Sequence, residues 1–121
     1  MIQNKLIALL LCAAGLTATS AFAAEKDTSS GNYWLAQCQN SDPNRSVACI
    51  NYIKGLRDGV QAQRILTKTN PVFCIPEAVT PGQLKDLFAK YLKDNPKNRH
   101  MPGDAILVYT LKQSYPCKDS D

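Results

Sequence analysis

Cysteines are the residues of this chain with the widest choice of chemistry. Of the five in the sequence, Cys12 lies in an N-terminal apolar segment, and the others stand at positions 38, 49, 74 and 117. A cysteine can act as a nucleophile beside a base, bind zinc, or form a disulfide bond. Cys74 lies in the stretch VFCIPEAVTPGQ, just before a helix start, and the stretch alone fits all three roles.

The residues elsewhere in the chain argue against catalysis and metal binding. The one histidine, His100, lies in a polar segment that we expect at the far end of a helical hairpin from Cys74, so it cannot serve as its base. No Cys-x-x-Cys or histidine-rich spacing supports zinc. Paired carboxylates, a glycine-rich phosphate loop and a Gly-x-Ser-x-Gly turn are also missing from the sequence. We therefore expect no catalytic residue, no metal, no cofactor and no enzymatic activity.

The N-terminus has the three parts of a secretory signal peptide. Lys5 lies in a short polar start, residues 6–16 are apolar, and Ala21 and Ala23 are the small residues that precede a cleavage site. The apolar run is too short to span a bilayer. We expect a signal peptide over 1–23, removed with its Cys12, and one small domain over 24–121 that is periplasmic and not membrane-bound.

Four cysteines in a small exported domain indicate a disulfide framework. The net charge of +4 comes from lysines and arginines that alternate with acidic residues. Because they form no basic stripe, the sequence does not predict nucleic-acid binding.

Hydrophobic periodicity predicts an all-α domain of about four helices. A short helix is expected at 33–38, and a long amphipathic one at 46–66 after a turn at 40–45. Thr80, Pro81 and Gln83 form the start of a third helix, with a Thr-x-x-Gln capping box. Residues 105–111 are nearly all apolar and fit a strand or a helix by periodicity. We favour a helix because Pro102 and Asp104 suit a helix start.

Two glycines interrupt the long helix. Gly55 and Gly59 each cost about 1 kcal/mol relative to alanine in a helix interior. With Ala48 and Ala62 they form a ridge of small residues that lets another backbone approach closely. We expect the ridge to pack against another helix of the same chain, with a subunit interface as the alternative.

The expected helical hairpin predicts the disulfide pairing. Two helices joined by a short connection pack antiparallel, so Cys74, before the first, should lie beside Cys117, after the second. Cys38 and Cys49 flank the turn at 40–45 and can meet across it. Of the three possible connectivities we favour Cys38–Cys49 with Cys74–Cys117.

Two stretches of the chain carry a family resemblance. CINYIKGLRDGV at 49–60, and the sequence from FCIPEAVTPGQ to SYPC at 73–117, resemble the Rap/Tai family of type VI secretion amidase immunity proteins. The resemblance implies a helical periplasmic protein, generally a homodimer, that binds and blocks a cell-wall amidase effector. A small periplasmic stress or envelope protein, such as an acid-stress chaperone, is the alternative on a similar scaffold.

The loop DNPKNRHMPGD at 94–104 is the expected partner-binding element. Pro96 and Pro102 stiffen it, and a pre-shaped protruding segment loses little entropy on binding. We expect Asn98, Arg99 and His100 at its centre to offer hydrogen-bond donors to the partner.

Overall fold

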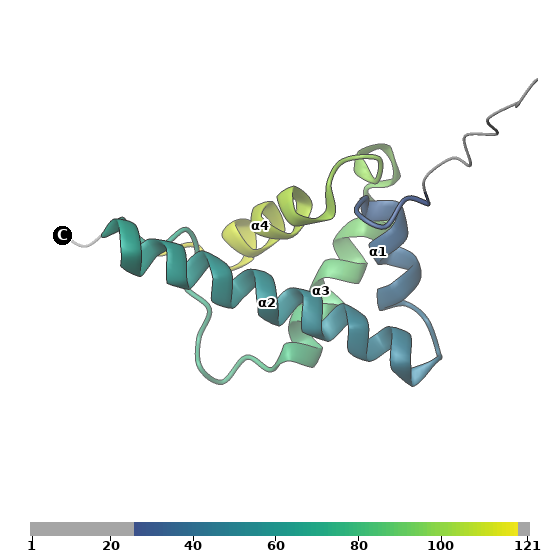
Figure 1. The fold of residues 1–121 in the computed structure, drawn as a ribbon, viewed down its shortest axis with the longest axis horizontal. Coiled ribbons are helices and arrows are strands. Elements are labelled where there is room, and N and C mark those ends of the chain that lie inside the picture. Colours follow the sequence, from purple (N-terminus) through teal and green to yellow (C-terminus); the bar gives the residue numbers. More distant parts are fainter. Residues whose placement is uncertain (1–25, 119–121) are drawn as a thin grey trace, which may run out of the picture.

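Four α-helices form nearly all the regular structure of the protein. The computed structural model describes residues 26–118, so the expected signal peptide over 1–23 lies outside the described residues. The helices are α1 (Gly31–Cys38), α2 (Pro43–Thr67), α3 (Pro81–Asp94) and α4 (Gly103–Ser114), with a 3-10 turn, η1 (Pro96–Asn98), between α3 and α4 (Figure 1). The described residues contain no strand, only an isolated bridge between Ser30 and Pro102. The predicted all-α fold is confirmed.

The helix starts follow from local hydrogen bonding. Thr80 Oγ1 accepts from the N–H of Gln83, and Gln83 Oε1 accepts from the N–H of Thr80, which completes the predicted capping box. The long helix begins at Pro43 and not at residue 46 as expected. Asp42 accepts from the N–H of Asn44 at 2.9 Å and Pro43 suits the first helical position, so the turn before α2 is shorter than predicted.

The N-terminal helix is fixed to the connection between α3 and α4. The N–H of Gly31 donates to the carbonyl of Met101 at 3.0 Å, and the N–H of Asn32 donates to that of Arg99 at 2.9 Å. Before α1, Ser30 donates to the Asp27 carboxylate through its hydroxyl and its N–H, and these bonds lower the pKa of Asp27. Figure 1 accordingly shows α1 at the end of the molecule where α3 turns into α4.

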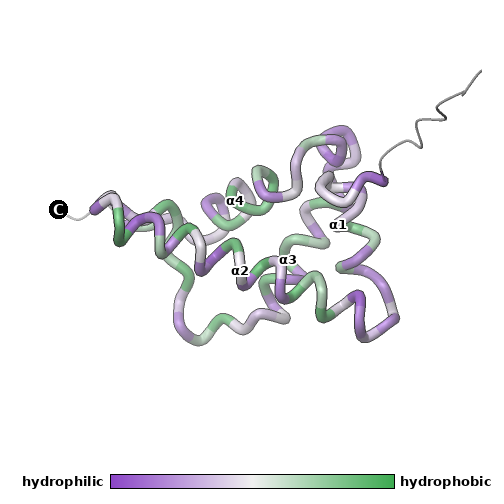
Figure 2. Tube along the Cα trace, viewed as in Figure 1, coloured by the Kyte–Doolittle hydropathy of each residue, from purple (hydrophilic) through white to green (hydrophobic). Residues whose placement is uncertain are grey.

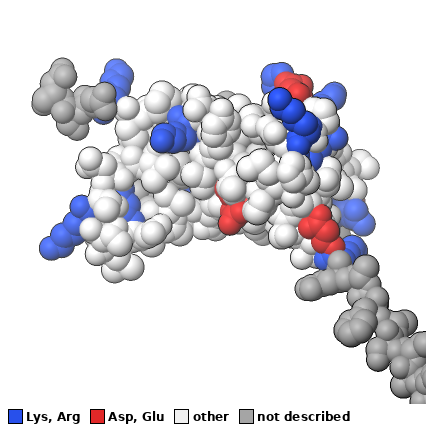
Figure 3. Space-filling model, turned by 90° about the horizontal axis from the view of Figure 1, so that it is seen from above, with Lys and Arg blue, Asp and Glu red and all other residues white. Residues whose placement is uncertain are grey.

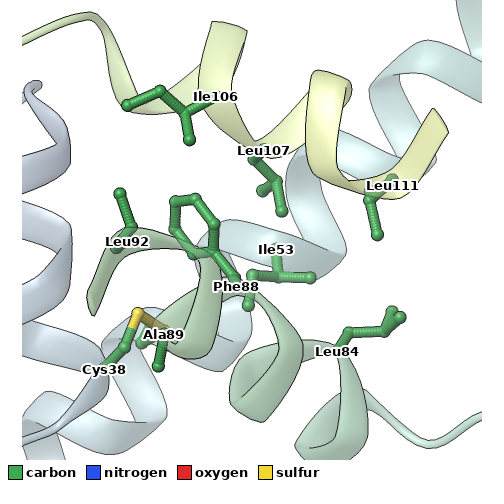
Figure 4. Close-up of a cluster of buried hydrophobic side chains, with 10 residues drawn as sticks. Cys38, Ile53, Leu84, Phe88, Ala89, Leu92, Ile106, Leu107 and Leu111 are labelled. Atoms are coloured by element: carbon green, nitrogen blue, oxygen red, sulfur yellow. A yellow bond between two sulfur atoms is a disulfide. The ribbon is translucent and has the colours of Figure 1, made fainter. Parts of the chain in front are cut away.

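One hydrophobic core holds the four helices together. Phe88 of α3 is fully buried in one cluster with Ile53 of α2 and Leu107 of α4 (Figure 4). Figure 2 shows hydrophobic residues alternating with hydrophilic ones along α2 and α3, as amphipathic helices require. Among residues 26–118, no helix is long and apolar enough to cross a membrane.

The cysteines form two disulfide bonds. Cys38 pairs with Cys49, and Cys74 pairs with Cys117, each with an S–S distance of 2.05 Å. These are the two pairs that the hairpin argument favours. The first is buried in the core, whereas the second lies near the surface and ties the segment before α3 to the segment after α4.

The glycine ridge of α2 does not pack against another helix within residues 26–118, so that prediction was wrong. A Cβ built on Gly55 or Gly59 meets nothing within 4 Å, and Ala48 and Ala62 are also exposed. The physical reason is that α2 buries only Cys49 and Ile53, which lie on another face, so the small residues are left toward open space. The alternative reading as a subunit interface stays a prediction.

The close approaches in the fold occur at two other glycines. A Cβ on Gly103 would overlap the Trp34 ring and lie 3.0 Å from the carbonyl oxygen of Ser29. The Trp34 ring cannot easily retreat, because it stacks on Tyr52 with ring centroids 3.7 Å apart. At Gly31, a Cβ would lie 3.0 Å from the carbonyl oxygen of Arg99. Glycine is therefore required where α1 meets the start of α4.

Alanine substitutions at these glycines are expected to have opposite effects. Gly103→Ala should lower the free energy of unfolding by about 1–3 kcal/mol through overpacking against Trp34. Gly55→Ala should raise it by up to about 1 kcal/mol, because alanine is the better helix former and the site is open in the monomer. Urea unfolding at low protein concentration measures both. Equal effects of the two substitutions would contradict the assignment of which glycines lie in packed contacts.

Candidate partner-binding surface

Arg99, in the connection after α3, is turned back onto the end of that helix. Its Nε donates to the carbonyl oxygen of Leu92 at 2.6 Å, and its Nη2 donates to that of Lys93 at 2.9 Å. These carbonyls belong to the last turn of α3 and have no partner within the helix, so the guanidinium caps them and places a positive charge at the helix C-terminus. Arg99 therefore positions the loop, and the partner-binding role expected for it stays a prediction.

The other two loop residues predicted to bind a partner differ from each other. Asn98 is half-buried, and its Nδ2 donates to the Tyr91 hydroxyl at 3.3 Å, which ties the loop to α3. His100 is exposed and follows directly after the anchored Arg99. Of the three residues, the structure leaves only His100 fully open to a partner.

An apolar surface that the sequence reasoning missed lies beside the loop. It surrounds a shallow cavity of 360 Å³, and we call it the loop-side patch, defined by Tyr91, Met101, Ala105 and Tyr109. Met101 is 40% exposed and Tyr109 is 50% exposed, while the Tyr91 and Tyr109 rings lie 5.8 Å apart. Tyrosine and methionine are enriched in protein interfaces, and tyrosine is frequent among the residues that dominate binding energy.

A pattern in α4 could have revealed this patch. Within the apolar run, the buried positions are Ile106, Leu107, Thr110 and Leu111, and the remaining positions include Ala105 and Tyr109, one turn apart. Once the run is read as a helix, these two residues fall on the outer face. The sequence prediction treated the run as uniformly apolar and did not separate its two faces.

A second hollow lies at the other end of the α3–α4 hairpin, and we call it the α2 groove. Its volume is 460 Å³. One wall comes from α2, with Arg57, Asp58, Gln61 and Arg64, and the other from the segment 71–76, which contains Cys74. Beyond the groove, the last turn of α2 is solvent-exposed and carries Ile65 and Leu66, which are 62% and 81% exposed.

Charge is distributed unevenly over the surface. In the view of Figure 3, basic side chains gather at the two ends of the molecule and the middle is mostly uncharged.

Tyr52 of α2 has a shifted pKa. Burial raises the pKa of Tyr52 to about 12, and the Asp104 carboxylate adds to the rise. Tyr52 is therefore a neutral, stacked phenol at physiological pH and not a general base.

The structure bears on two of the roles considered for the cysteines, nucleophile and metal ligand. All four described cysteines are in disulfides, so none supplies a thiolate. No group of three or more His, Cys, Asp or Glu side chains within residues 26–118 could hold a metal ion. What the geometry does offer is exposed apolar surface beside a rigidly anchored loop, on a scaffold closed by two disulfides. Exposed apolar surface of this kind is a candidate for binding a protein partner.

Comparison with known proteins identifies the kind of module. The chain matches the family of Rap1a immunity proteins over residues 30–117, which is nearly the whole described structure. The protein belongs to this family, so it is an immunity protein whose partner is an effector protein. Neither the search of curated proteins nor the search of solved structures gave a match.

Proposed function

We propose that this protein is a periplasmic immunity protein that binds and inhibits a type VI secretion peptidoglycan amidase. The observation that carries the proposal is membership of the Rap1a immunity family over residues 30–117. The resemblance of residues 49–60 and 73–117 to amidase immunity proteins supports the amidase as the effector class. The signal pattern over 1–23 supports the periplasm, where a peptidoglycan amidase reaches its substrate.

The loop-side patch is the proposed contact surface for the amidase. Its aromatic and methionine side chains are already exposed, and the adjacent loop is held by Arg99 and Asn98 before any partner arrives. A surface that is ordered in advance loses less conformational entropy on binding. Inhibition then follows if the loop and patch cover the entrance of the amidase cleft and exclude the cell-wall peptide.

We also propose a homodimer that forms through the exposed small-residue face of α2. Ala48, Gly55 and Ala62 recur every seven residues, and each is exposed in the monomer. Two such helices can approach closely because no bulky side chain separates their backbones. In such a dimer, alanine at Gly55 would crowd the contact, so the gain in stability expected for the monomer would become a loss at dimer concentrations.

The function is tested by producing the protein together with a type VI secretion peptidoglycan amidase. Cells exporting the amidase alone should lyse, and cells exporting both proteins should survive. The purified pair should form a stable complex, and sedimentation of the immunity protein alone should show a concentration-dependent dimer.

A variant that lacks residues 2–23 provides the matched control. It should bind the amidase after purification and oxidation of its cysteines, but should not protect cells, because it stays in the cytoplasm. Equal protection by this variant would contradict the periplasmic location. Absence of a complex would contradict the amidase as the partner, and a monomer at every concentration would contradict the dimer.

A further inference from the structure

The α2 groove has one polar and one apolar wall. On the polar wall, Arg57, Gln61 and Arg64 stand at helical spacings of four and three residues, so they line the same face of α2. Arg57 and Arg64 are separated by about 10 Å along the helix axis. On the facing wall, Phe73 and Ile75 rest against the hydrophobic core and present apolar surface to the groove.

The two guanidinium groups are only partly used within the chain. Arg57 Nε donates to Asp58 at 2.9 Å, and Arg64 Nε donates to Gln61 Oε1 at 3.1 Å. Among residues 26–118, the terminal nitrogens of both side chains have no hydrogen-bond partner. Asp58 is the one acidic residue among those that line the groove, so the groove keeps a net positive charge. Guanidinium groups with free terminal N–H donors bind carboxylates in a two-pronged geometry.

The apolar wall is fixed in place before any ligand binds. Cys74 lies in it, is joined to Cys117 by the disulfide, and donates its N–H to the carbonyl of Tyr115 at 2.8 Å. The segment 71–76 is therefore held to the end of α4 although it contains no helix or strand. A groove with a fixed wall needs little ordering when it binds a partner.

We propose that the α2 groove binds an extended acidic segment of a protein partner, in which carboxylate side chains alternate with apolar ones. Successive side chains of an extended chain point in opposite directions, so the acidic residues would face Arg57 and Arg64 while the apolar ones face Phe73 and Ile75. In an extended chain, acidic residues two positions apart are separated by about 6.7 Å, and those four positions apart by about 13 Å. The longer spacing is enough to span Arg57 and Arg64, which are about 10 Å apart along the helix axis. Charge complementarity selects this occupant over a basic or neutral segment.

This binding surface is distinct from the one proposed for the amidase. The loop-side patch lies where α3 turns into α4, whereas the groove lies beside the disulfide at the opposite end of that hairpin. The inference therefore extends the proposed function and does not depend on the identity of the effector. It can be tested with a synthetic peptide in place of the partner.

The experiment is a nuclear magnetic resonance titration with the probe peptide acetyl-Glu-Val-Glu-Val-Glu-amide, whose outer glutamates are four positions apart. We expect saturable chemical-shift changes at the Arg57 and Arg64 Nε–H groups and at the Phe73 and Ile75 amides. The affinity for the peptide should fall as ionic strength rises. Arg57→Ala and Arg64→Ala should each weaken binding about tenfold. Arg57→Lys should recover little of this loss, because lysine keeps the charge but lacks the planar fork. Arg45→Ala, an exposed change in the first turn of α2 and outside the groove, should have no effect.

Four outcomes would overturn the inference. The first is equal binding of the peptide in which glutamine replaces glutamate, and the second is unchanged affinity in both arginine-to-alanine variants. The third is a dimer that Arg57→Ala dissociates, since the groove would then hold a second copy of the chain. The fourth is binding that appears only after Asp119→Asn and Asp121→Asn, because the chain's own carboxylates would then occupy the groove.

Discussion

Replacing both Cys74 and Cys117 by serine is expected to lower the free energy of unfolding by about 4 kcal/mol. The disulfide closes a loop with a sequence separation of 43 residues, and in the chain-entropy model such a loop restricts the unfolded chain by that amount. A small domain has a total stability of about 5–15 kcal/mol, so the variant should lose a large part of it. Denaturant unfolding followed by circular dichroism measures the change.

The other disulfide provides the matched comparison. Cys38 and Cys49 close a loop with a separation of 11 residues, for which the same model gives about 3 kcal/mol. Alanine is the suitable replacement there, because both cysteines are buried and a serine hydroxyl would need a partner. A loss below about 1 kcal/mol in the Cys74 and Cys117 variant would show that the unfolded chain stays compact even without this disulfide. The loop-entropy model would then not apply.

Local sequence signals predicted the helices and the disulfides correctly. The capping box at Thr80 and Gln83 involves residues three apart, so its hydrogen bonds do not depend on the rest of the fold. The Cys74–Cys117 pairing required only that α3 and α4 form an antiparallel hairpin. Even the early start of α2 has a local cause, the cap at Asp42 followed by Pro43, which a closer reading of the turn could have found.

The partner-binding surface could not be predicted in the same way, because it depends on which face of each helix the core leaves uncovered. Gly55 and Gly59 have the spacing of a close helix contact, yet none of the other described helices reaches that face of α2. Arginine is a residue type that often donates hydrogen bonds to a partner at the surface. The guanidinium of Arg99, however, is held by the carbonyls at the end of α3, which lie within its reach. In both cases the residue type indicated a possible contact, and only the tertiary arrangement decided whether the contact forms.

Replacing Met101 and Tyr109 by alanine is expected to weaken binding to the amidase by at least about 30-fold. Hot-spot side chains at the centre of an interface, among which tyrosine is enriched, contribute 2 kcal/mol or more, and that free energy corresponds to the stated factor. The fold should survive, because neither side chain belongs to the buried core. Cells that carry the double variant should lyse when the amidase is exported at levels the unaltered protein neutralises.

Two single variants separate binding from folding in this test. Val47→Ala removes an exposed apolar side chain from the first part of α2, far from the loop, and should leave both affinity and protection unchanged. Arg99→Ala should lower the melting temperature, because it leaves the carbonyls at the end of α3 without their donors. If the Met101 and Tyr109 double variant keeps full affinity and native melting, the loop-side patch is not the contact surface. The amidase must then bind elsewhere, and the exposed face of α2 becomes the surface to mutate next, since its small residues expose backbone that a partner can approach closely.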